Sequence, residues 1–168
     1  MQFRDAIIDD LPIIVAIYNS TIAGRMVTAD TTAVAVADKV QWFHQHNNNK
    51  RPLWVVEDDD KKIIGWVSFQ DFYGRPAYNG TAEISIYLDE TERGKSYGKK
   101  MLEYAIEKSP SLGIHTLLGF IFAQNITSLQ LFAKLGFEEW ANLKDVAILD
   151  DKSCSLKIVG RKINAINN

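Results

Sequence analysis

The sequence has little of what secreted, disulfide-stabilised or membrane-spanning proteins usually contain. Cys154 is the only cysteine among the 168 residues, so no disulfide can form within the chain. Nothing in it requires an oxidising compartment. The most apolar run near the start, residues 13–17, follows acidic residues and Pro12 rather than a basic segment, and it is too short to cross a bilayer. We therefore expect a cytoplasmic protein without a membrane partner.

Neither sign of charge dominates the chain. It carries 19 Lys and Arg residues against 21 Asp and Glu residues, for a formal net charge of -2. A protein that binds nucleic acid through its phosphates usually has a clear positive excess. The balance therefore argues against a nucleic-acid partner and favours a small molecule.

Length and composition indicate one globular domain. Hydrophobic residues make up 46% of the chain and charged residues 24%, which is typical of a soluble protein. A chain of this length can bury roughly 70% of the surface that its unfolded form exposes, so it needs neither disulfides nor a structural metal to hold a core. No repeat, low-complexity tract or linker divides it. We expect a single domain over residues 1–168.

Hydrophobic periodicity predicts a mixed α/β architecture. Strands are expected at residues 2–6, 53–57, 63–72, 81–88, 115–122, 137–146 and 156–161, the second and third forming an antiparallel hairpin. Helices are expected between Asp10 and Gly24, over residues 38–46, around Met101 up to Pro110, and from Ile126 to Gly136. Asp9 and Asp10 are candidate N-caps of the first helix, and Gly24 and Gly136 are candidate C-caps.

Several catalytic signatures are missing. Gly94 and Gly98 are separated by three residues where a Walker A loop has four, and Lys100 follows Lys99 where that loop requires Ser or Thr after Lys. No GxSxG, GxGxxG or HExxH pattern occurs, so serine-hydrolase, dinucleotide-binding and zinc-peptidase chemistry lack their signatures. We expect no metal site, because structural roles are favoured for the histidines His44, His46 and His115.

The most informative segment is residues 83–102. An apolar strand leads into a turn with Gly94 and Gly98, and the turn leads into an amphipathic helix. The free N–H groups of a first helical turn attract anions, and glycine lets a phosphate approach the backbone. Four basic residues add positive charge: Arg93, Lys95, Lys99 and Lys100. Spacing alone leaves two interpretations open: a phosphate-binding turn, or an ordinary glycine-containing turn with solvated lysines.

The same segment resembles a known family. Residues 93–98 after an apolar strand, followed by Asn125, Ser128 and residues 135–137, resemble the acetyl-CoA-binding core of the GNAT N-acetyltransferases. Residues 3–6, 10–12, 17–19, 74–76 and 83–85 resemble one branch, the phosphinothricin and methionine sulfoximine N-acetyltransferases. The resemblance implies the GNAT acyl-CoA N-acyltransferase fold: a mixed, mostly antiparallel sheet, splayed near its fourth and fifth strands, flanked by helices on both faces. It also implies acetyl-CoA, a small-molecule amine acceptor and a homodimer.

The resemblance further implies which residues bind acetyl-CoA. The backbone of the fourth strand would pair with the pantetheine arm like an added strand, and its N–H groups would stabilise the developing thioester oxyanion. The turn and the helix start would hold the pyrophosphate, and an asparagine would bond the cofactor from the next helix. The implied residues are Ile86, Tyr87, Leu88, Arg93, Gly94, Lys95, Ser96, Tyr97, Gly98, Lys99 and Asn125.

Glu83 resembles the general base of this branch. Because an α-amine has a pKa of roughly 7.7 to 8.0, it is already partly neutral near pH 7, and a modest base acting through water suffices. The Arg75 guanidinium would face a substrate carboxylate. The implied substrate-binding residues are Arg75, Pro76, Ala77, Glu83, Ile84 and Ser85. The residues alone also fit a solvent-facing Glu83 and an ordinary surface Arg75.

Two residues depart from the family pattern. Ser96 occupies a position where the family prefers glycine, so serine is strained there if the backbone has positive φ and tolerable if it only donates its N–H. Phe132 stands where many members carry a tyrosine proposed to protonate the departing thiolate, which phenylalanine cannot do. We expect weaker cofactor binding at most, with the thiolate released directly or protonated through water.

The sequence therefore predicts an acetyl-CoA-dependent N-acetyltransferase in which the α-amine of a small amino acid or analogue attacks the thioester directly. Two alternatives stay open: an acetyltransferase for another amine, such as a protein N-terminus or a polyamine, and a non-catalytic acyl-CoA-binding module. Most aromatic residues are expected to pack the core or the sheet. Phe69 and Tyr73 are candidates for lining the acceptor pocket, and Trp42 for packing the second helix or contacting a second subunit.

Overall fold

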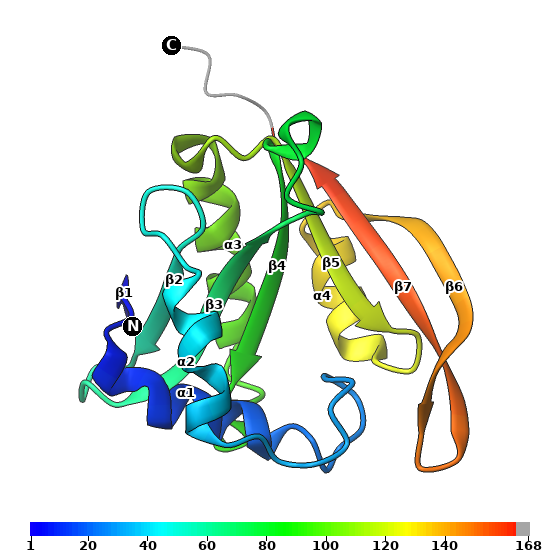
Figure 1. Cartoon of the computed structure of the whole chain (residues 1–168), viewed down its shortest axis with the longest axis horizontal. Helices are drawn as coiled ribbons and strands as arrows, with labels where there is room; N and C mark the ends of the chain where they lie inside the picture. The colour runs from blue at the N-terminus through cyan, green and yellow to red at the C-terminus, as the bar shows by residue number, and fades with distance from the viewer. Residues whose placement is uncertain (164–168) are drawn as a thin grey trace.

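The computed structural model describes residues 1–163, which are built around one seven-stranded sheet. Its strands are β1 (Gln2–Asp5), β2 (Leu53–Glu57), β3 (Ile63–Asp71), β4 (Thr81–Leu88), β5 (Thr116–Phe122), β6 (Glu138–Leu149) and β7 (Lys152–Lys162). They lie in the order β1-β2-β3-β4-β5-β7-β6 (Figure 1). Within the described residues β4 and β5 form the one parallel pair, so the sheet is mixed and mostly antiparallel, as the family resemblance implies.

Helices cover both faces of the sheet (Figure 1). Helices α1 (Leu11–Ser20) and α2 (Val36–His44) lie on one face, and α3 (Tyr97–Lys108) and α4 (Ile126–Lys134) lie on the other. Successive side chains of a strand point to opposite faces. In β3, Trp66 therefore packs with Ile14 of α1, whereas Val67 packs with Met101 and Leu102 of α3. Each layer of helices thus has its own apolar core against the sheet.

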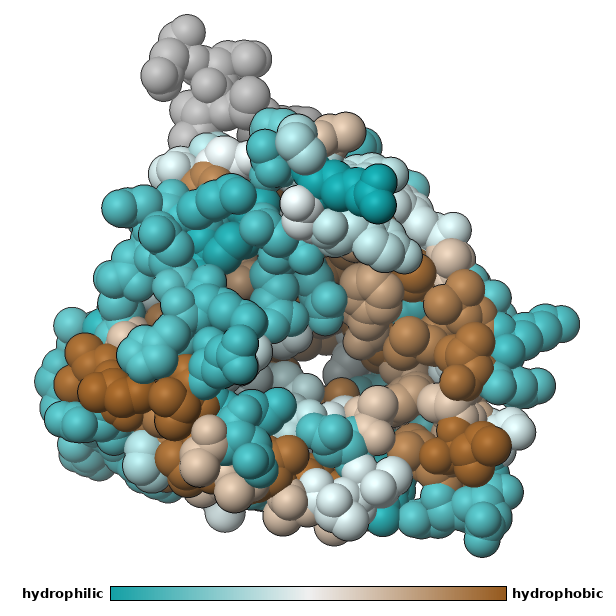
Figure 2. Space-filling view, in the orientation of Figure 1, coloured by the Kyte–Doolittle hydropathy of each residue, from teal (hydrophilic) through white to brown (hydrophobic). Residues whose placement is uncertain are grey.

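The sheet splits between β4 and β5. The two strands pair only from Thr81 opposite Thr116 to Glu83 opposite Leu118, and they diverge beyond that point. Figure 2 shows the molecular surface hollowed between the two halves. The second half of β4 therefore has an edge that no described strand covers, which is the splay that the family resemblance implies.

A long loop, residues 21–35, connects α1 to α2 and reaches the far half of the sheet (Figure 1). Arg25 forms a two-point ion pair with Asp150 in the β6–β7 turn, with N···O distances of 2.8 and 2.9 Å. Gln124 Nε2 donates to the Arg25 carbonyl at 3.3 Å, and Asn125 Nδ2 donates to the Met26 carbonyl at 3.0 Å. The loop therefore ties the α1–α2 layer to the β5–β7 half of the molecule.

The predicted elements are all present, but the ends of the first helix differ from the prediction. α1 ends at Ser20, where the main-chain bonds change to three-residue turns: the Thr21 N–H donates to the Tyr18 carbonyl at 3.1 Å and the Ile22 N–H to the Asn19 carbonyl at 3.2 Å. Gly24 is therefore not its C-cap. Asp10 stands at the N-cap position, but its carboxylate accepts from the Ile7 N–H and from Arg4 rather than from the helix.

At the other end of the chain, Gly136 has a φ of 78° and follows α4 as predicted. β6 and β7 are longer than predicted and meet at a tight turn in which Asp150 and Asp151 have φ values of 48° and 61°. Asparagine and glycine are the usual signals for such a turn. A pair of aspartates is a weaker signal of a turn. The predicted strands therefore stop short of the true ends of the hairpin.

Candidate active site

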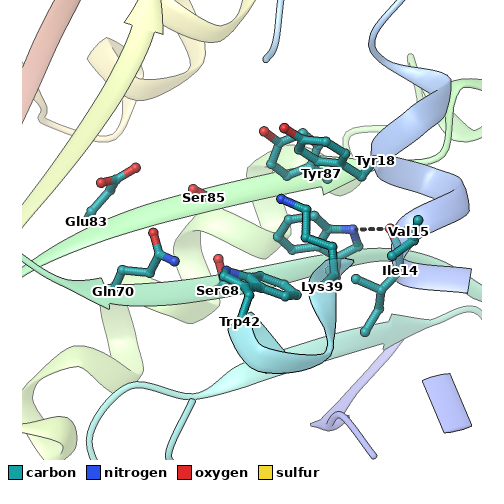
Figure 3. A pocket seen from close by; sticks show the side chains of 11 residues that line it. Ile14, Val15, Tyr18, Lys39, Trp42, Ser68, Gln70, Glu83, Ser85 and Tyr87 are labelled. Atoms are coloured by element: carbon teal, nitrogen blue, oxygen red, sulfur yellow. Dashed lines mark hydrogen bonds between the residues drawn. The ribbon is translucent and has the colours of Figure 1, made fainter. Parts of the chain in front are cut away.

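A cavity of about 250 Å³ lies between the β3–β4 face of the sheet and the helices α1 and α2 (Figure 3). Its lining residues are Ile14, Val15 and Tyr18 from α1, Lys39 and Trp42 from α2, Trp66, Ser68 and Gln70 from β3, and Glu83, Ser85 and Tyr87 from β4. Aromatic side chains with a few convergent polar groups are typical of sites for small ligands.

The strand register assembles the floor of this cavity. Three pairs of directly opposite residues on β3 and β4 form it: Trp66–Tyr87, Ser68–Ser85 and Gln70–Glu83. Because opposite residues share a face of the sheet, their side chains form one continuous strip on the α1–α2 side. Ile84, between Glu83 and Ser85, points to the other face and is buried in the core against α3. The floor thus runs from an aromatic end to a polar end.

The aromatic end is rigid. The Tyr87 ring stacks on Trp66 with the ring centroids 4.3 Å apart, and Trp66 Nε1 donates to the Ile14 carbonyl at 3.1 Å. Trp42 meets Trp66 edge-on at 5.7 Å, and the rings of Tyr18 and Tyr87 are 5.1 Å apart. Packed aromatic rings of this kind restrain one another, so this end of the cavity has a fixed shape.

The α1–α2 loop closes onto the aromatic end. The Tyr18 hydroxyl donates to Asp30 Oδ2 and shares a hydrogen bond with the Thr28 hydroxyl. Burial, together with the bond to Asp30, raises the pKa of Tyr18 to about 12. Tyr18 therefore stays protonated at neutral pH and holds the loop against the cavity as a hydrogen-bond donor.

Glu83 supplies an acidic group at the polar end. Its side chain is half-buried and rises from β4 opposite Gln70 (Figure 3). Burial raises the pKa of Glu83 above its ordinary value, and no ion pair with another described residue opposes that shift. A carboxylate of raised pKa that opens onto a cavity is suited to accept a proton near neutral pH.

The main chain of β4 alternates between its two neighbours. The Gly80 carbonyl accepts from the Thr116 N–H of β5 at 3.0 Å, whereas the Asp89 N–H donates to the Ile64 carbonyl of β3 at 2.8 Å. Because main-chain groups of successive residues point to opposite edges of a strand, even-numbered residues of β4 face β5 and odd-numbered residues face β3.

This alternation decides which β4 groups are free. Pairing with β5 stops at Glu83, so the N–H and C=O groups of Ile86 and Leu88 face the open split. The main chain of Tyr87 is turned toward β3, opposite Trp66. A ligand in the split can therefore form ladder bonds with Ile86 and Leu88 but not with the backbone of Tyr87, which the sequence also assigns to the cofactor.

The turn after β4 leads into the N-terminus of α3. Gly94 has a φ of 81° and open space where a side chain would lie. Ser96 has a φ of 61°, and its hydroxyl makes no capping bond to the helix. The N–H groups from Tyr97 onward are the free donors of a 12-residue helix, whose positive dipole end attracts anions. The sequence left open whether serine at position 96 is strained or tolerable. Because its φ is positive, Ser96 is strained.

The basic residues of this turn contact acidic neighbours. Three ion pairs involve them: Arg93 with Glu90 at 3.1 Å, Lys95 with Glu92 at 2.8 Å, and Lys99 with Glu103 at 3.5 Å. The basic side chains are about half exposed, so each pair is weak and readily exchanged. The turn therefore combines a preformed backbone site with mobile positive charge.

Comparison with known proteins identifies this arrangement. Residues 11–137 match the model of the Acetyltransferase (GNAT) family. The chain belongs to the GNAT acetyltransferases. It is 51% identical over 164 residues to the Bacillus subtilis protein named "Putative phosphinothricin acetyltransferase YwnH", covering 98% of this chain and 100% of that protein. It is 33% identical over 137 residues to the L-methionine sulfoximine/L-methionine sulfone acetyltransferase of Pseudomonas aeruginosa, covering 82% of this chain and 80% of that protein.

Solved GNAT structures agree with the fold. The crystal structure of "a putative phosphinothricin N-acetyltransferase" is 50% identical with a TM-score of 0.94, and the match covers 97% of this chain and 98% of that one. A phosphinothricin acetyltransferase from Sinorhizobium meliloti, solved in complex with acetyl-CoA, is 26% identical with a TM-score of 0.90 over 99% of this chain and 91% of that one. The predicted fold and the predicted branch resemblance are confirmed.

In this GNAT chain Asn125 lies at the N-cap of α4. Its Oδ1 accepts from the Ser128 N–H at 3.1 Å, and its Nδ2 donates to the Met26 carbonyl at 3.0 Å. The side chain thus sits at the far side of the β4–β5 split, in contact with the α1–α2 loop. A cofactor that bonds to its Nδ2 would replace the contact with Met26.

The cavity does not contain every residue that the sequence assigns to the substrate. Arg75, Pro76 and Ala77 lie in the exposed β3–β4 connection and are not part of its lining, and the side chain of Ile84 is in the core. Glu83 and Ser85 do line it.

The cavity also includes residues that sequence reasoning did not assign to a site. Trp42 lines it rather than only packing α2, whereas Phe69 is fully buried on the α3 face and Tyr73 is 77% exposed. Lys39 and Gln70 were missed because they are brought in by α2 and by the β3–β4 register. A period-two alternation of polar and aromatic residues at 66, 68 and 70 was the available signal.

Phe132 lies in the core beside β5. Its ring is 4.8 Å from the Phe137 ring, and a Cβ on Gly119 would come within 2.8 Å of it. Glycine at 119 therefore makes room for this ring. No hydroxyl is present at this position to donate a proton.

Among the described residues, no group of three His, Cys, Asp or Glu side chains is arranged to hold a metal ion. None of the helices in the described part of the chain is both long enough and apolar enough to span a membrane.

Proposed function

We propose that this protein transfers the acetyl group of acetyl-CoA to the α-amine of a small amino acid or analogue, such as phosphinothricin or methionine sulfoximine. The proposal rests above all on Glu83, a half-buried carboxylate of raised pKa that opens onto a cavity beside the free edge of β4. The names of the relatives support this class of acceptor, and the solved complex of a relative supports the donor.

The residues present fit acetyl-CoA, which when bound supplies an activated thioester. Ile86 and Leu88 would bond the pantetheine amides through their free main-chain groups, and Tyr87 would contribute through its side chain at the cavity floor. The N–H groups of residues 94–99 would hold the pyrophosphate, with Gly94 leaving space for it. Arg93, Lys95 and Lys99 would add charge, and Asn125 would bond the cofactor from α4.

Glu83 prepares the acceptor for reaction. An ammonium group has no lone pair, so the amine must lose a proton before it attacks a thioester. Glu83 accepts that proton, directly or through a water molecule, and its burial makes it a stronger base than an exposed carboxylate. The amine then attacks the carbonyl directly, and free N–H groups of β4 stabilise the charge that develops on the carbonyl oxygen. Cys154 is buried in a separate small cluster and takes no part.

Arg75, Pro76 and Ala77 contribute to the acceptor site from the β3–β4 connection. Pro76 and Ala77 lie in a short 3₁₀ turn, Pro76–Tyr78, directly before β4. Arg75 is exposed and has the planar shape that recognises a carboxylate. Ser85 adds a hydroxyl from the floor, and Ile84 adds only its main chain. Phe132 donates no proton, so the departing thiolate leaves as such or takes a proton from water.

Acetyl-CoA turnover with a panel of amines tests this function. Release of free thiol should be fastest with methionine sulfoximine, methionine sulfone and phosphinothricin, and slow with polyamines and peptide N-termini. Faster turnover with a polyamine or peptide would reassign the acceptor. Acetyl-CoA binding with no transfer to any amine would instead mark a non-catalytic acyl-CoA-binding module.

Three further properties belong to the proposal. Residues 1–168 form a single domain, supported by the one continuous sheet of the described part. The protein forms a homodimer, supported by exposed Trp140, Val146 and Ile148 on β6, where Figure 2 shows hydrophobic surface. It acts in the cytoplasm, where the thiol of its single cysteine stays reduced. Light scattering of the purified protein and fractionation of cells test the last two.

A further inference from the structure

Lys39 is an unusual lysine in this molecule. It projects from α2 into the cavity and is half-buried, with Nζ 4.9 Å from the centre of the Tyr18 ring and 6.0 Å from that of Trp42. It forms no ion pair with any carboxylate of the described residues, and the other lysines of that part without an ion pair are all exposed: Lys100, Lys134, Lys144, Lys152 and Lys162. A partly buried ammonium gains from the faces of aromatic rings, but an anion satisfies it better.

The cavity places this cation opposite a carboxylate. Figure 3 shows Lys39 reaching over the floor from α2 and Glu83 rising from β4 at the polar end. Ser68 and Ser85 form the floor between the two ends and offer neutral hydroxyl groups. An amino acid carries an amine and an anionic group on one small skeleton. The cavity therefore has the charge pattern that is complementary to this class of molecule.

We propose that Lys39 binds an oxyanion of the acceptor, its carboxylate or a phosphinate on its side chain, and so selects anionic acceptors. This inference rests on the proposed function and adds to it the residue that sets acceptor charge. A positive group beside the acceptor site also disfavours polyamines, because like charges repel. Arg75, proposed above to recognise a carboxylate, lies outside the cavity lining on an exposed connection, so an oxyanion held inside the cavity falls to Lys39, which lines it.

Lys39→Met removes the charge and keeps much of the apolar length, and Lys39→Arg retains the charge. We expect the KM of Lys39→Met to rise about 10- to 100-fold for the acceptor whose oxyanion Lys39 binds: for both methionine sulfoximine and phosphinothricin if it is the carboxylate, and for phosphinothricin if it is the phosphinate, because a bond to a charged group is lost. The kcat value and the KM for acetyl-CoA should change by less than about threefold, since Lys39 is proposed to bind the acceptor and is not among the residues assigned to acetyl-CoA. Lys39→Arg should recover much of the lost affinity.

The acceptor carboxamide, in which the carboxylate is replaced by a neutral amide, completes the comparison. If Lys39 binds the carboxylate, wild type and Lys39→Met use this amide with equal KM. If Lys39 binds a side-chain phosphinate, the loss is larger for phosphinothricin than for methionine sulfoximine. Lys134→Met, a lysine on the exposed part of α4, is the matched charge control and should behave as wild type.

An unchanged KM of Lys39→Met for both acceptors, with normal turnover of wild type, would overturn the role of Lys39 and leave the proposed function intact. Failure of the wild type to acetylate any amino acid would instead overturn the proposed function. Circular dichroism and the KM for acetyl-CoA confirm that the variant is folded.

Discussion

At Glu83, proton affinity and stability are linked. The ordinary pKa of 4.5 for this carboxyl is raised by burial in the folded protein. The folded state therefore binds the proton more tightly than the unfolded state. The stabilisation from this tighter proton binding at Glu83 is fully present below the pKa of the unfolded state, and it is lost as the pH rises through the pKa of the folded state. At neutral pH the ionised side chain thus costs stability, and the same burial makes it an effective base.

Replacing Glu83 with Gln separates these two effects. We expect kcat/KM for the acceptor to fall about 100-fold, because a positioned base is lost, with little change in the KM for acetyl-CoA. In this variant the fall in rate at low pH should follow the protonation of the acceptor amine alone. The melting temperature should rise relative to wild type near pH 7.5 but not near pH 4, where Glu83 is already protonated.

Glu138→Gln, on exposed β6, is the control for the loss of one acidic charge. Equal rates and superimposable pH profiles of wild type and Glu83→Gln would remove Glu83 as the base.

Ser96 shows how one backbone angle carries a cost. A non-glycine residue in the left-handed region destabilises the folded state by about 1–2 kcal/mol through steric strain. Ordering a glycine on folding costs about 0.5–1 kcal/mol more conformational entropy than ordering another residue. Ser96→Gly should therefore raise the free energy of unfolding by about 0.5–1 kcal/mol. Its KM for acetyl-CoA should stay equal or fall, because the turn needs no strain to present its N–H groups.

Denaturant titration and steady-state kinetics measure both quantities. Ser96→Ala is the control, since alanine keeps the Cβ and the strain and removes only the hydroxyl. A loss of stability in Ser96→Gly would show that the hydroxyl, and not the positive φ, decides this position.

At the scale of elements, the α1–α2 loop links three parts of the site. Its Arg25 end is held by Asp150 in the β6–β7 turn, its Met26 carbonyl by Asn125 at the start of α4, and its Asp30 end by Tyr18 at the cavity. Ile22 at its start is buried, and further along the loop these polar contacts hold it at separate points. Loss of one of these contacts should therefore weaken the binding of the acceptor in the cavity.

Asp150→Asn tests this link, because asparagine tolerates the left-handed backbone of the turn but cannot form the ion pair. We expect the acceptor KM to rise about two- to fivefold at low salt, the range of a weak exposed pair. The difference from wild type should shrink at high salt, where the wild-type pair is screened.

Asp151→Asn changes the next residue of the same turn, which also has positive φ, and serves as the matched control. If both variants bind the acceptor as wild type does, the ion pair does not position the loop.

At the scale of the whole molecule, the split in the sheet leaves main-chain groups of β4 free to bind a ligand. Residues of β4 that face the split lack strand partners among the described residues, whereas those facing β3 are paired along the strand. Amide hydrogen exchange should therefore be fast at Ile86 and Leu88 and slow at Tyr87 in the free protein. Saturating acetyl-CoA should slow Ile86 and Leu88 strongly, because a ligand occupies their N–H groups.

Residue-resolved exchange measured by NMR distinguishes this local effect from general stabilisation. At about 100 times its Kd, a ligand stabilises the folded state by about 2.7 kcal/mol, which slows globally protected amides everywhere. Slow exchange at Ile86 and Leu88 without the ligand would mean that the split is closed in solution.

The local part of the fold follows from the sequence because hydrophobic periodicity is a local signal. The alternation in residues 81–88 and the helical spacing around Met101 predict their elements, and Gly136 predicts the end of α4. The predicted ends of elements are wrong where side chains bond to distant or unusual partners. Asp10 bonds to Arg4 and Ile7 instead of capping α1, and the aspartate turn at Asp150 carries no strong hairpin signal.

By itself the sequence determined the class of the protein: a mixed α/β chain whose turn at residues 93–98 and acidic Glu83 have the spacing of one acyltransferase family. Only the tertiary structure decided what meets at the cavity. Lys39 and Glu83 are far apart in the chain, and they share one cavity because α2 packs over the β3–β4 face. A strand pattern fixes which face a side chain takes, whereas its neighbours across the cavity depend on how separate elements pack.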